Sequence, residues 1–295
     1  MDVLTDAVAA MRIGTPHSSR TEIRAPWGVR FPPQDGAGFH VVLQGSCWLL
    51  QAHGEPIRLE VGDVAFLPRE LGHALADSPT TPLAETGSPA VAATGSGALT
   101  VLLCGAYRLD QGRIHPLLAE LPDVVHLPAR VGRHSSLRGA IDLLGLELDT
   151  ENLPGTSGVI AALLEVLLLY MLRAWHREQT GISGWSAALS DPAISSALHA
   201  MHRDPAAPWT VKSLGMQAGL SRSAFAHRFA SIVGSTPQSY LTWWRMTLAV
   251  RLLRDTDEPL RGIARRCGYT SEYAFAKAFK REFGTAPGRY RTRAA

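Results

Sequence analysis

The chain has 295 residues, a formal net charge of +3 and an apolar share of 46%, which together exclude a disordered chain and leave room for two domains. Its three cysteines, Cys47, Cys104 and Cys267, have no metal-like spacing and fit a reducing cytoplasm. The first residues include Asp2 and Asp6 and lack an apolar run, so no signal peptide is expected.

The part of the chain up to about Leu127 has the pattern of short strands. Three runs rich in Val, Leu and aromatic residues are punctuated by Gly and Pro, and they span 39–52, 56–68 and 98–110. Between the last two runs, residues 77–97 are rich in Pro, Gly, Ser, Thr and Ala. This segment predicts a mobile surface loop.

Helical periodicity begins near His134, and a long helix is predicted over 157–177, followed by another over 191–202. The apolar run 159–175 is short for a bilayer and carries Glu165, so we expect a buried helix in a soluble protein with no membrane partner. This helix is apolar almost all round. One face can cover the strands, and the other is covered either by the same chain or by a second copy in a homodimer.

The C-terminal part contains one helical pattern twice. "SRSAFAHRF" begins at Ser221 and "SEYAFAKAF" begins at Ser271, each with an apolar stripe of helical period and a serine at the N-cap position. Each copy is preceded by a shorter helical run that ends at a glycine, which predicts two helix-turn-helix motifs at about 211–233 and 260–283. Residues 236–256 predict a helix that links them.

The faces opposite the apolar stripes carry small, hydrogen-bonding or cationic residues, which can enter a major groove and reach bases or phosphates. The candidate DNA-binding residues are Ser221, Arg222, Ser223, His227 and Arg228 in the first motif, and Ser271, Glu272, Tyr273, Lys277 and Lys280 in the second. From Asp191 onward the chain has 16 Lys and Arg against 7 Asp and Glu, a net +9, whereas the rest is net −6. We therefore expect the region from Asp191 onward to bind double-stranded DNA by itself.

The run from "WTVKSLGMQAGLS" to "IARRCGYTSEYAFAKAFKREFGTAPGRYR" resembles the DNA-binding domain of AraC/XylS-type transcription regulators over about the last hundred residues. Cys267 stands where that family usually has an aliphatic residue, and we expect it to be a packed small hydrophobe. The resemblance implies that the helices beginning at Ser221 and Ser271 enter successive major grooves of promoter DNA. RNA polymerase is implied as a further partner if the protein is an activator.

The N-terminal half resembles the cupin-type sensor domain common in this family. "GDVAFLPRELGHALAD" is similar to the second cupin motif, and His73 stands where cupin enzymes have a metal ligand. The first motif, with its pair of histidines and a glutamate, is not present, and "GFHVVLQGS" offers only His40. A divalent metal at His40 and His73 is the alternative to no cofactor, because these two residues leave a ligand set of three incomplete.

Cys47 and Cys104 lie in two predicted strands and are candidates for redox sensing, which some cupin-type members of this family perform. The alternative is that both are buried and inert. His40 and His73, nearby in the expected fold, could lower the pKa of a thiol. An unidentified small-molecule effector in the barrel is the other sensor hypothesis.

The sequence thus predicts an α+β protein with a cupin-like β-barrel at 1–130, a helical linker and possible dimerisation region at 131–190, and an all-α double helix-turn-helix domain at 191–295. We expect a cytoplasmic DNA-binding transcription regulator and not an enzyme. The alternative is a cupin-type metalloenzyme with an incidental nucleic-acid-binding tail. A third possibility is a scaffold without an effector, which a filled barrel with no cavity would favour. Because the linker is expected to be the only connection between the two halves, it is the predicted switch element.

Overall fold

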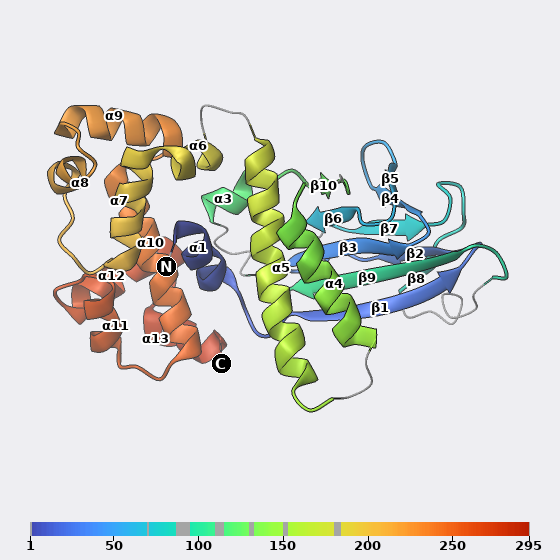
Figure 1. Ribbon diagram of the computed structural model, residues 1–295. Coiled ribbons are helices and arrows are strands. Elements are labelled where there is room, and N and C mark those ends of the chain that lie inside the picture. The colour runs from blue at the N-terminus through green and yellow to red at the C-terminus, as the bar shows by residue number, and fades with distance from the viewer. Residues whose placement is uncertain are drawn as a thin grey trace. The chain divides into compact units, whose positions relative to one another are not determined.

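The computed structural model describes residues 2–69, 71–86, 95–109, 115–129, 133–149, 153–179 and 184–294 (Figure 1). The chain divides into two compact units. One, called here the helical unit, comprises Met1–Met11, His115–Glu120 and Thr180–Ala295. The other, called the sheet unit, comprises Arg12–Ile114 and Leu121–Gln179.

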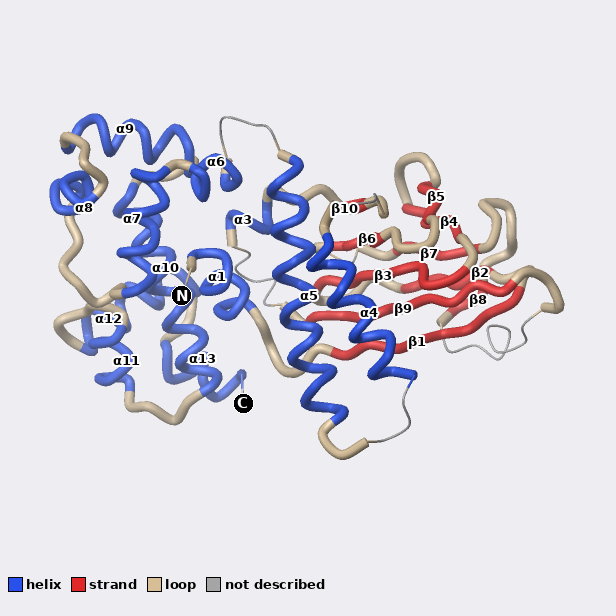
Figure 2. Tube along the Cα trace, viewed as in Figure 1, coloured by secondary structure: helices blue, strands red, loops and turns tan. Residues whose placement is uncertain are grey.

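The sheet unit contains two five-stranded sheets (Figure 2). Their strand orders are β1-β9-β3-β6-β10 and β5-β4-β7-β2-β8, with antiparallel pairs throughout except the parallel pair β2–β8. The strands are β1 (His17–Arg24), β2 (Gly28–Phe31), β3 (Ala37–Gln44), β4 (Cys47–Gln51), β5 (Ile57–Leu59), β6 (Val64–Leu67), β7 (His73–Ala76), β8 (Ala84–Glu85), β9 (Leu99–Tyr107) and β10 (Val125–Leu127).

Apolar side chains from both sheets form the core of this unit, because alternate residues of a strand point to the same face. On β4, for example, Cys47 and Leu49 are buried whereas Trp48 is only partly so. The buried cluster comprises Ile23, Trp27, Val29, Val42, Cys47, Leu49, Leu59, Ala65, Leu75 and Leu102, with Cys104 and Phe31 packed against it. This cluster draws on strands of both sheets and lies between them.

Two helices, α4 (Ser135–Asp149) and α5 (Thr156–Glu178), lie side by side in the sheet unit (Figure 1). Both pack against β1, and α5 also packs against β10. By length and composition α5 could cross a membrane, but Glu165 within it forms an ion pair with Arg12. The buried residues of α5, such as Leu164 and Leu168, face the unit itself, which agrees with the predicted covering role.

The helical unit consists of helices alone in the part of the chain that the structure describes. Its helices are α1 (Val3–Met11), α3 (Pro116–Ala119), α6 (Trp185–Ser190), α7 (Pro192–Arg203), α8 (Val211–Gln217), α9 (Arg222–Val233), α10 (Pro237–Asp255), α11 (Leu260–Arg266), α12 (Glu272–Phe283) and α13 (Pro287–Ala294). The two predicted helix-turn-helix motifs are confirmed as α8–α9 and α11–α12, and α10 is the linking helix.

The two motifs begin and end with the same local interactions. Ser221 Oγ accepts the N–H of Ala224, and Ser271 Oγ accepts the N–H of Ala274, so both serines are N-caps as predicted. Each second helix ends at a glycine in the left-handed conformation, Gly234 with φ 76° and Gly284 with φ 69°. A residue with a Cβ is disfavoured in this conformation, which explains the repeated glycine.

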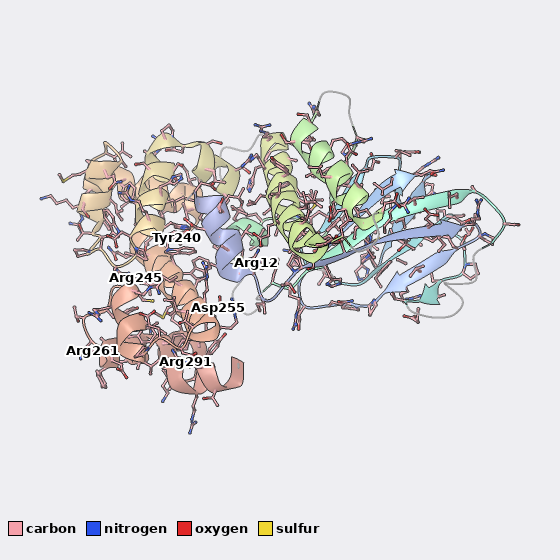
Figure 3. The ribbon with its side chains drawn as sticks, turned by 60° about the horizontal axis from the view of Figure 1, so that its bottom comes forward. Arg12, Tyr240, Arg245, Asp255, Arg261 and Arg291 are labelled. Atoms are coloured by element: carbon pink, nitrogen blue, oxygen red, sulfur yellow. The ribbon has the colours of Figure 1, made fainter. Side chains whose placement is uncertain are left out.

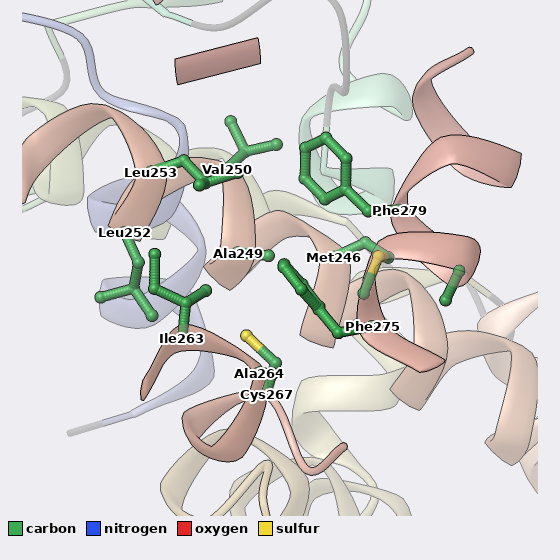
Figure 4. Packing of buried hydrophobic residues seen from close by; sticks show 11 residues of the cluster. Met246, Ala249, Val250, Leu252, Leu253, Ile263, Ala264, Cys267, Phe275 and Phe279 are labelled. Atoms are coloured by element: carbon green, nitrogen blue, oxygen red, sulfur yellow. The ribbon is translucent and has the colours of Figure 1, made fainter. Parts of the chain in front are cut away.

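The second motif is built around a cluster that α10, α11 and α12 share (Figure 4). Phe275 and Phe279 are fully buried in it, with ring centroids 5.7 Å apart. Cys267 is also fully buried among these residues, which confirms the prediction that it packs as a small hydrophobe.

The division into units differs from the expected domain boundaries. The expected linker at 131–190 splits, because α4 and α5 pack with the sheets whereas α6 packs with α7 and α9. The helices α1 and α3, not predicted from the sequence, belong to the helical unit although they lie within the expected barrel range 1–130. The linker is therefore not the only connection, since the chain passes between units at Met11, at His115, at Glu120 and at Thr180.

The expected loop at 77–97 contains one short strand. Ala84–Glu85 form β8, which pairs with β2. Residues 87–94 of that loop lie outside the described residues.

Candidate functional site

The exposed face of α9 carries most of the residues predicted for the first motif. Arg222, Ser223 and His227 are all exposed, and Ser221 is exposed at the N-cap. The opposite face holds Phe225 and Phe229, which are fully buried. The amphipathic pattern therefore presents the predicted residues to solvent on one helix.

Arg228 also lies on α9, but its guanidinium contacts Asp191. Its Nε and Nη2 donate to Asp191 Oδ2 at 2.8 Å and 2.5 Å. The other oxygen of Asp191 accepts the N–H groups of Ala193 and Ile194 and caps α7. Burial opposes the charge on Asp191, but these hydrogen bonds outweigh it and lower the pKa of the carboxyl. Arg228 thus joins α9 to the start of α7.

The exposed face of α12 is the counterpart in the second motif. Glu272, Lys277 and Lys280 are exposed there, and Tyr273 leaves 79% of its surface accessible although it is a large aromatic residue. Ser271 is exposed at the N-cap, so all five residues predicted for this motif are exposed. Cations and hydrogen-bonding groups on an exposed helix suit contacts with phosphates and base edges.

Arg245 on α10 connects the turn of the second motif to the segment before the first (Figure 3). Its guanidinium donates to the carbonyls of Pro205 and Ala207 at 2.7 Å and 2.9 Å. It also lies against Gly268, where an added Cβ would come within 2.6 Å of Nη2. With 19 residues, α10 is about 28 Å long, so it is a rigid spacer between the motifs.

Sequence reasoning did not select Met216, an exposed apolar residue of the first motif. It lies near the end of α8, three residues before Gly219, and leaves 71% of its surface accessible. The glycine turn that follows was the available signal.

The sheet unit holds a second site, a hydrogen-bonded chain from Cys104 to His73 that we call the thiol–histidine cluster. His40 and Cys104 are directly paired residues of β3 and β9, and His40 Nδ1 lies 2.9 Å from Cys104 Sγ. His40 Nε2 lies 2.6 Å from His73 Nε2. The ring of Phe31 stacks on His73 with centroids 4.8 Å apart. Three of the four predicted sensor residues therefore meet, and Cys47 lies in the adjoining core cluster.

Burial determines the protonation of this cluster. It raises the pKa of Cys104 to about 12, with a further contribution from nearby Cys47, and it raises the pKa of Cys47 to about 12. It lowers the pKa of His73 to about 4 and that of His40 well below its usual range. The expectation that the histidines lower a thiol pKa is therefore wrong, because loss of solvation dominates and the cluster is neutral at pH 7.

His40 and His73 do not fit a divalent cation in this arrangement. Two imidazole ligands of a tetrahedral zinc ion place their nitrogens roughly 3.3 Å apart with both lone pairs directed at the metal. Here the two Nε2 atoms are hydrogen-bonded to each other at 2.6 Å. Among the described residues, no three His, Cys, Asp or Glu side chains are grouped so that they could hold a metal ion.

Comparisons with known proteins agree with both units. A family model described as a cupin matches residues 2–177, and one described as a helix-turn-helix domain matches residues 214–293. A putative AraC-like transcription regulator of Streptomyces lividans is 35% identical over 99% of this chain and 98% of that protein. The RCS-specific transcriptional activator RclR of Escherichia coli is 30% identical over 86% of this chain and 84% of its own length.

Among solved structures, the DNA-binding domain of AdpA in complex with a target DNA is 33% identical, with a TM-score of 0.33. It covers 35% of this chain and 92% of that domain. The cupin match, the duplicated helix-turn-helix and the full-length identity together show that this chain belongs to the family of AraC-like transcription regulators.

Proposed function

We propose that this protein is a cytoplasmic, sequence-specific transcription regulator whose sheet unit senses a thiol-reactive oxidant at Cys104. Oxidation there alters the affinity of the helical unit for double-stranded promoter DNA. The observation that carries the proposal is the hydrogen-bonded chain from Cys104 through His40 to His73. RNA polymerase is a further partner if the DNA response is activation.

The packed interior supports a chemical signal over an effector held inside the barrel. Ten buried side chains occupy the space between the sheets, so a small molecule there would have to displace them. An oxidant has to reach only one sulfur atom. Cys104 as a whole residue is partly exposed whereas Cys47 is buried, although burial of the Cys104 thiol raises its pKa to about 12.

The proposed reaction starts from the neutral cluster, in which the pKa of the Cys104 thiol is about 12, so the thiol has to lose its proton to His40 as it reacts. In the neutral cluster the thiol donates to His40 Nδ1, and His40 Nε2–H donates to His73 Nε2. His40 is then the base that takes the thiol proton as sulfur attacks a peroxide. The O–O bond breaks, one oxygen joins Sγ as a sulfenic acid, and the proton passes from His40 to the departing oxygen. Attack by the Cys47 thiol would next form a disulfide and release water.

The test compares wild type with Cys104→Ser and Cys47→Ser in a promoter assay with and without peroxide or hypochlorous acid. Cys267→Ala, at a cysteine buried in the second motif, is the matched control. We expect the response to disappear in Cys104→Ser and to persist in the control, and intact mass should show oxygen gained at Cys104 in wild type. An unchanged response in Cys104→Ser would disprove the proposal and favour a small-molecule effector.

We also infer that two copies associate through the outer faces of α4 and α5. Leu143, Val159 and Val166 leave 55%, 44% and 40% of their surfaces accessible there. A second copy would bury these apolar side chains. Val166→Glu should then shift the sedimentation of the protein toward the monomer, whereas Ser157→Glu near the start of α5 should not. A wild type that sediments as a monomer at all concentrations would contradict the inference.

A further inference from the structure

The helical unit is completed by two segments from outside the DNA-binding domain. The helix α1 packs against α7 and α10. The short segment His115–Glu120, which contains α3, belongs to the same unit. Neither lies within residues 214–293, the range of the helix-turn-helix family model. Both segments therefore add contacts to the helical unit that the helix-turn-helix motifs do not supply themselves.

A buried hydrogen-bond chain joins the α3 segment to α10 and α7, and an ion-pair contact extends it to α1. The N–H of Leu117 donates to His115 Nδ1 at 3.1 Å, so the proton of the His115 ring lies on Nε2. That N–H points to the Tyr240 hydroxyl at 3.4 Å, and the hydroxyl donates in turn to His202 Nε2 at 2.6 Å. The proton of the His202 ring is then on Nδ1, which lies 3.5 Å from Asp6 Oδ2.

The donor directions are consistent through the three hydrogen bonds, and the contact of His202 Nδ1 with Asp6 Oδ2 is an ion pair. The chain begins at the N-cap of α3, passes through α10 and α7, and ends on α1. When each group has a defined donor or acceptor role at each contact, a hydrogen-bond chain holds its side chains in one geometry. Loss of a single member leaves its neighbours buried without a partner.

Aromatic packing holds the same residues in place. His115 is fully buried, with its ring edge-on to Trp185 at 4.7 Å. The ring of His202 stacks on Trp244 with centroids 3.8 Å apart and planes 7° from parallel. Tyr240 and Trp244 are one turn apart on α10, so the two contacts fix the rotation of that helix about its axis.

The two outside segments also hold each other and α6. The backbone N–H of His115 donates to Met11 Sδ at 3.0 Å, which joins α3 to the end of α1. Glu120 Oε2 accepts the N–H of Trp185 at 2.8 Å at the start of α6. The six-residue segment is therefore attached at its first and last residues.

We propose that Asp6, His202, Tyr240 and His115 are positioning residues for DNA binding, which set the rotation and placement of α10 and thereby the relative orientation of the two motifs. Figure 3 shows Tyr240 and Arg245 on this helix. The helix α1 continues into the sheet unit at Arg12, and the α3 segment continues into it at Leu121. A conformational change in the sheet unit is therefore transmitted along the backbone to Asp6 and His115, the two ends of the hydrogen-bond chain. The inference holds whatever signal the sheet unit senses.

The experiment uses the full chain and a duplex that the full chain itself selects from random sequences. A second duplex keeps the half that the second motif binds and has the other half scrambled. Tyr240→Phe removes only the hydroxyl that joins the two histidines. We expect affinity for the complete duplex to fall about tenfold, while affinity for the half duplex stays within about twofold of wild type.

Tyr107→Phe is the matched control, because its equally buried hydroxyl donates to Leu164 inside the sheet unit. It should leave the ratio of the two affinities unchanged. Asp6→Asn is a second test at the other end of the chain, for use if Tyr240→Phe is unfolded by circular dichroism. A wild-type affinity ratio in the folded variants would overturn the proposal. This outcome includes equal losses of affinity on both duplexes, which would reflect general destabilisation of the variant.

Discussion

Replacing Asp191 tests how the first recognition helix is held in place. Its carboxylate caps α7 through the N–H groups of Ala193 and Ile194 and contacts Arg228 on α9. Loss of an N-cap costs about 0.5–2 kcal/mol of stability. The ion pair adds about 0.2–1 kcal/mol, because the Arg228 side chain is 50% exposed and solvent screens it. Asp191→Ala should therefore lower the free energy of unfolding by about 1–3 kcal/mol.

Asp191→Asn separates the two contributions, since the amide oxygen can still accept the N–H groups of α7. We expect it to cost less than about 1 kcal/mol, and Arg228→Ala to cost the same amount. The double variant should cost no more than either single change, because both remove one interaction. Urea unfolding of the full chain, followed by circular dichroism, gives these values.

Two results would refute this reasoning. If Asp191→Asn is as costly as Asp191→Ala, the ion pair and not the cap is the main interaction. If Arg228→Ala weakens binding to all DNA sequences alike and reduces the salt slope by about one, Arg228 contacts a phosphate and is one of the DNA-binding residues, as the sequence predicted.

Lys277→Ala removes an exposed cation of α12 and should lower operator affinity by about 1–3 kcal/mol in fluorescence anisotropy, whereas Glu147→Ala in the sheet unit should not. Phe279→Ala leaves a cavity beside the Phe283 ring, 4.4 Å away, and should cost about 3–5 kcal/mol in urea unfolding; a loss under 1 kcal/mol would contradict the packing. In the folded protein, burial lowers the pKa of His73 to about 4, so this side chain stays neutral. In the unfolded chain, His73 takes up a proton below about pH 6.5. As the pH falls from 6.5 to 4, the free energy of unfolding should thus fall by about 3 kcal/mol more in wild type than in His73→Gln. Equal losses of unfolding free energy in the two proteins would refute this.

The features predicted correctly from the sequence depend on local interactions. The serines at Ser221 and Ser271 cap helices whose N–H groups lie three residues away, and Gly284 ends a helix through its own backbone conformation. Such signals are complete within a few residues, so they can be recognised without knowledge of the fold.

The features that could not be predicted depend on distant partners. Nothing in the nine residues of α1 indicates that they pack on α10 and not on the neighbouring strands. The pairing of His40 with Cys104 depends on the register of β3 against β9, and a shift of one residue would place the two side chains on opposite faces. The strand β1 was missed because its sequence, HSSRTEIR, is largely polar.

The helix α1 has a consequence for how the protein is made. Its apolar residues Val3, Leu4 and Val8 are synthesised well before their partner α10, which begins 226 residues after α1 ends. At synthesis rates of about 5–20 residues per second, that interval is roughly ten to forty-five seconds. The nascent chain therefore carries an uncovered amphipathic helix for most of its synthesis. The helical unit is complete only after α10 has been synthesised, so its formation depends on late, long-range contacts.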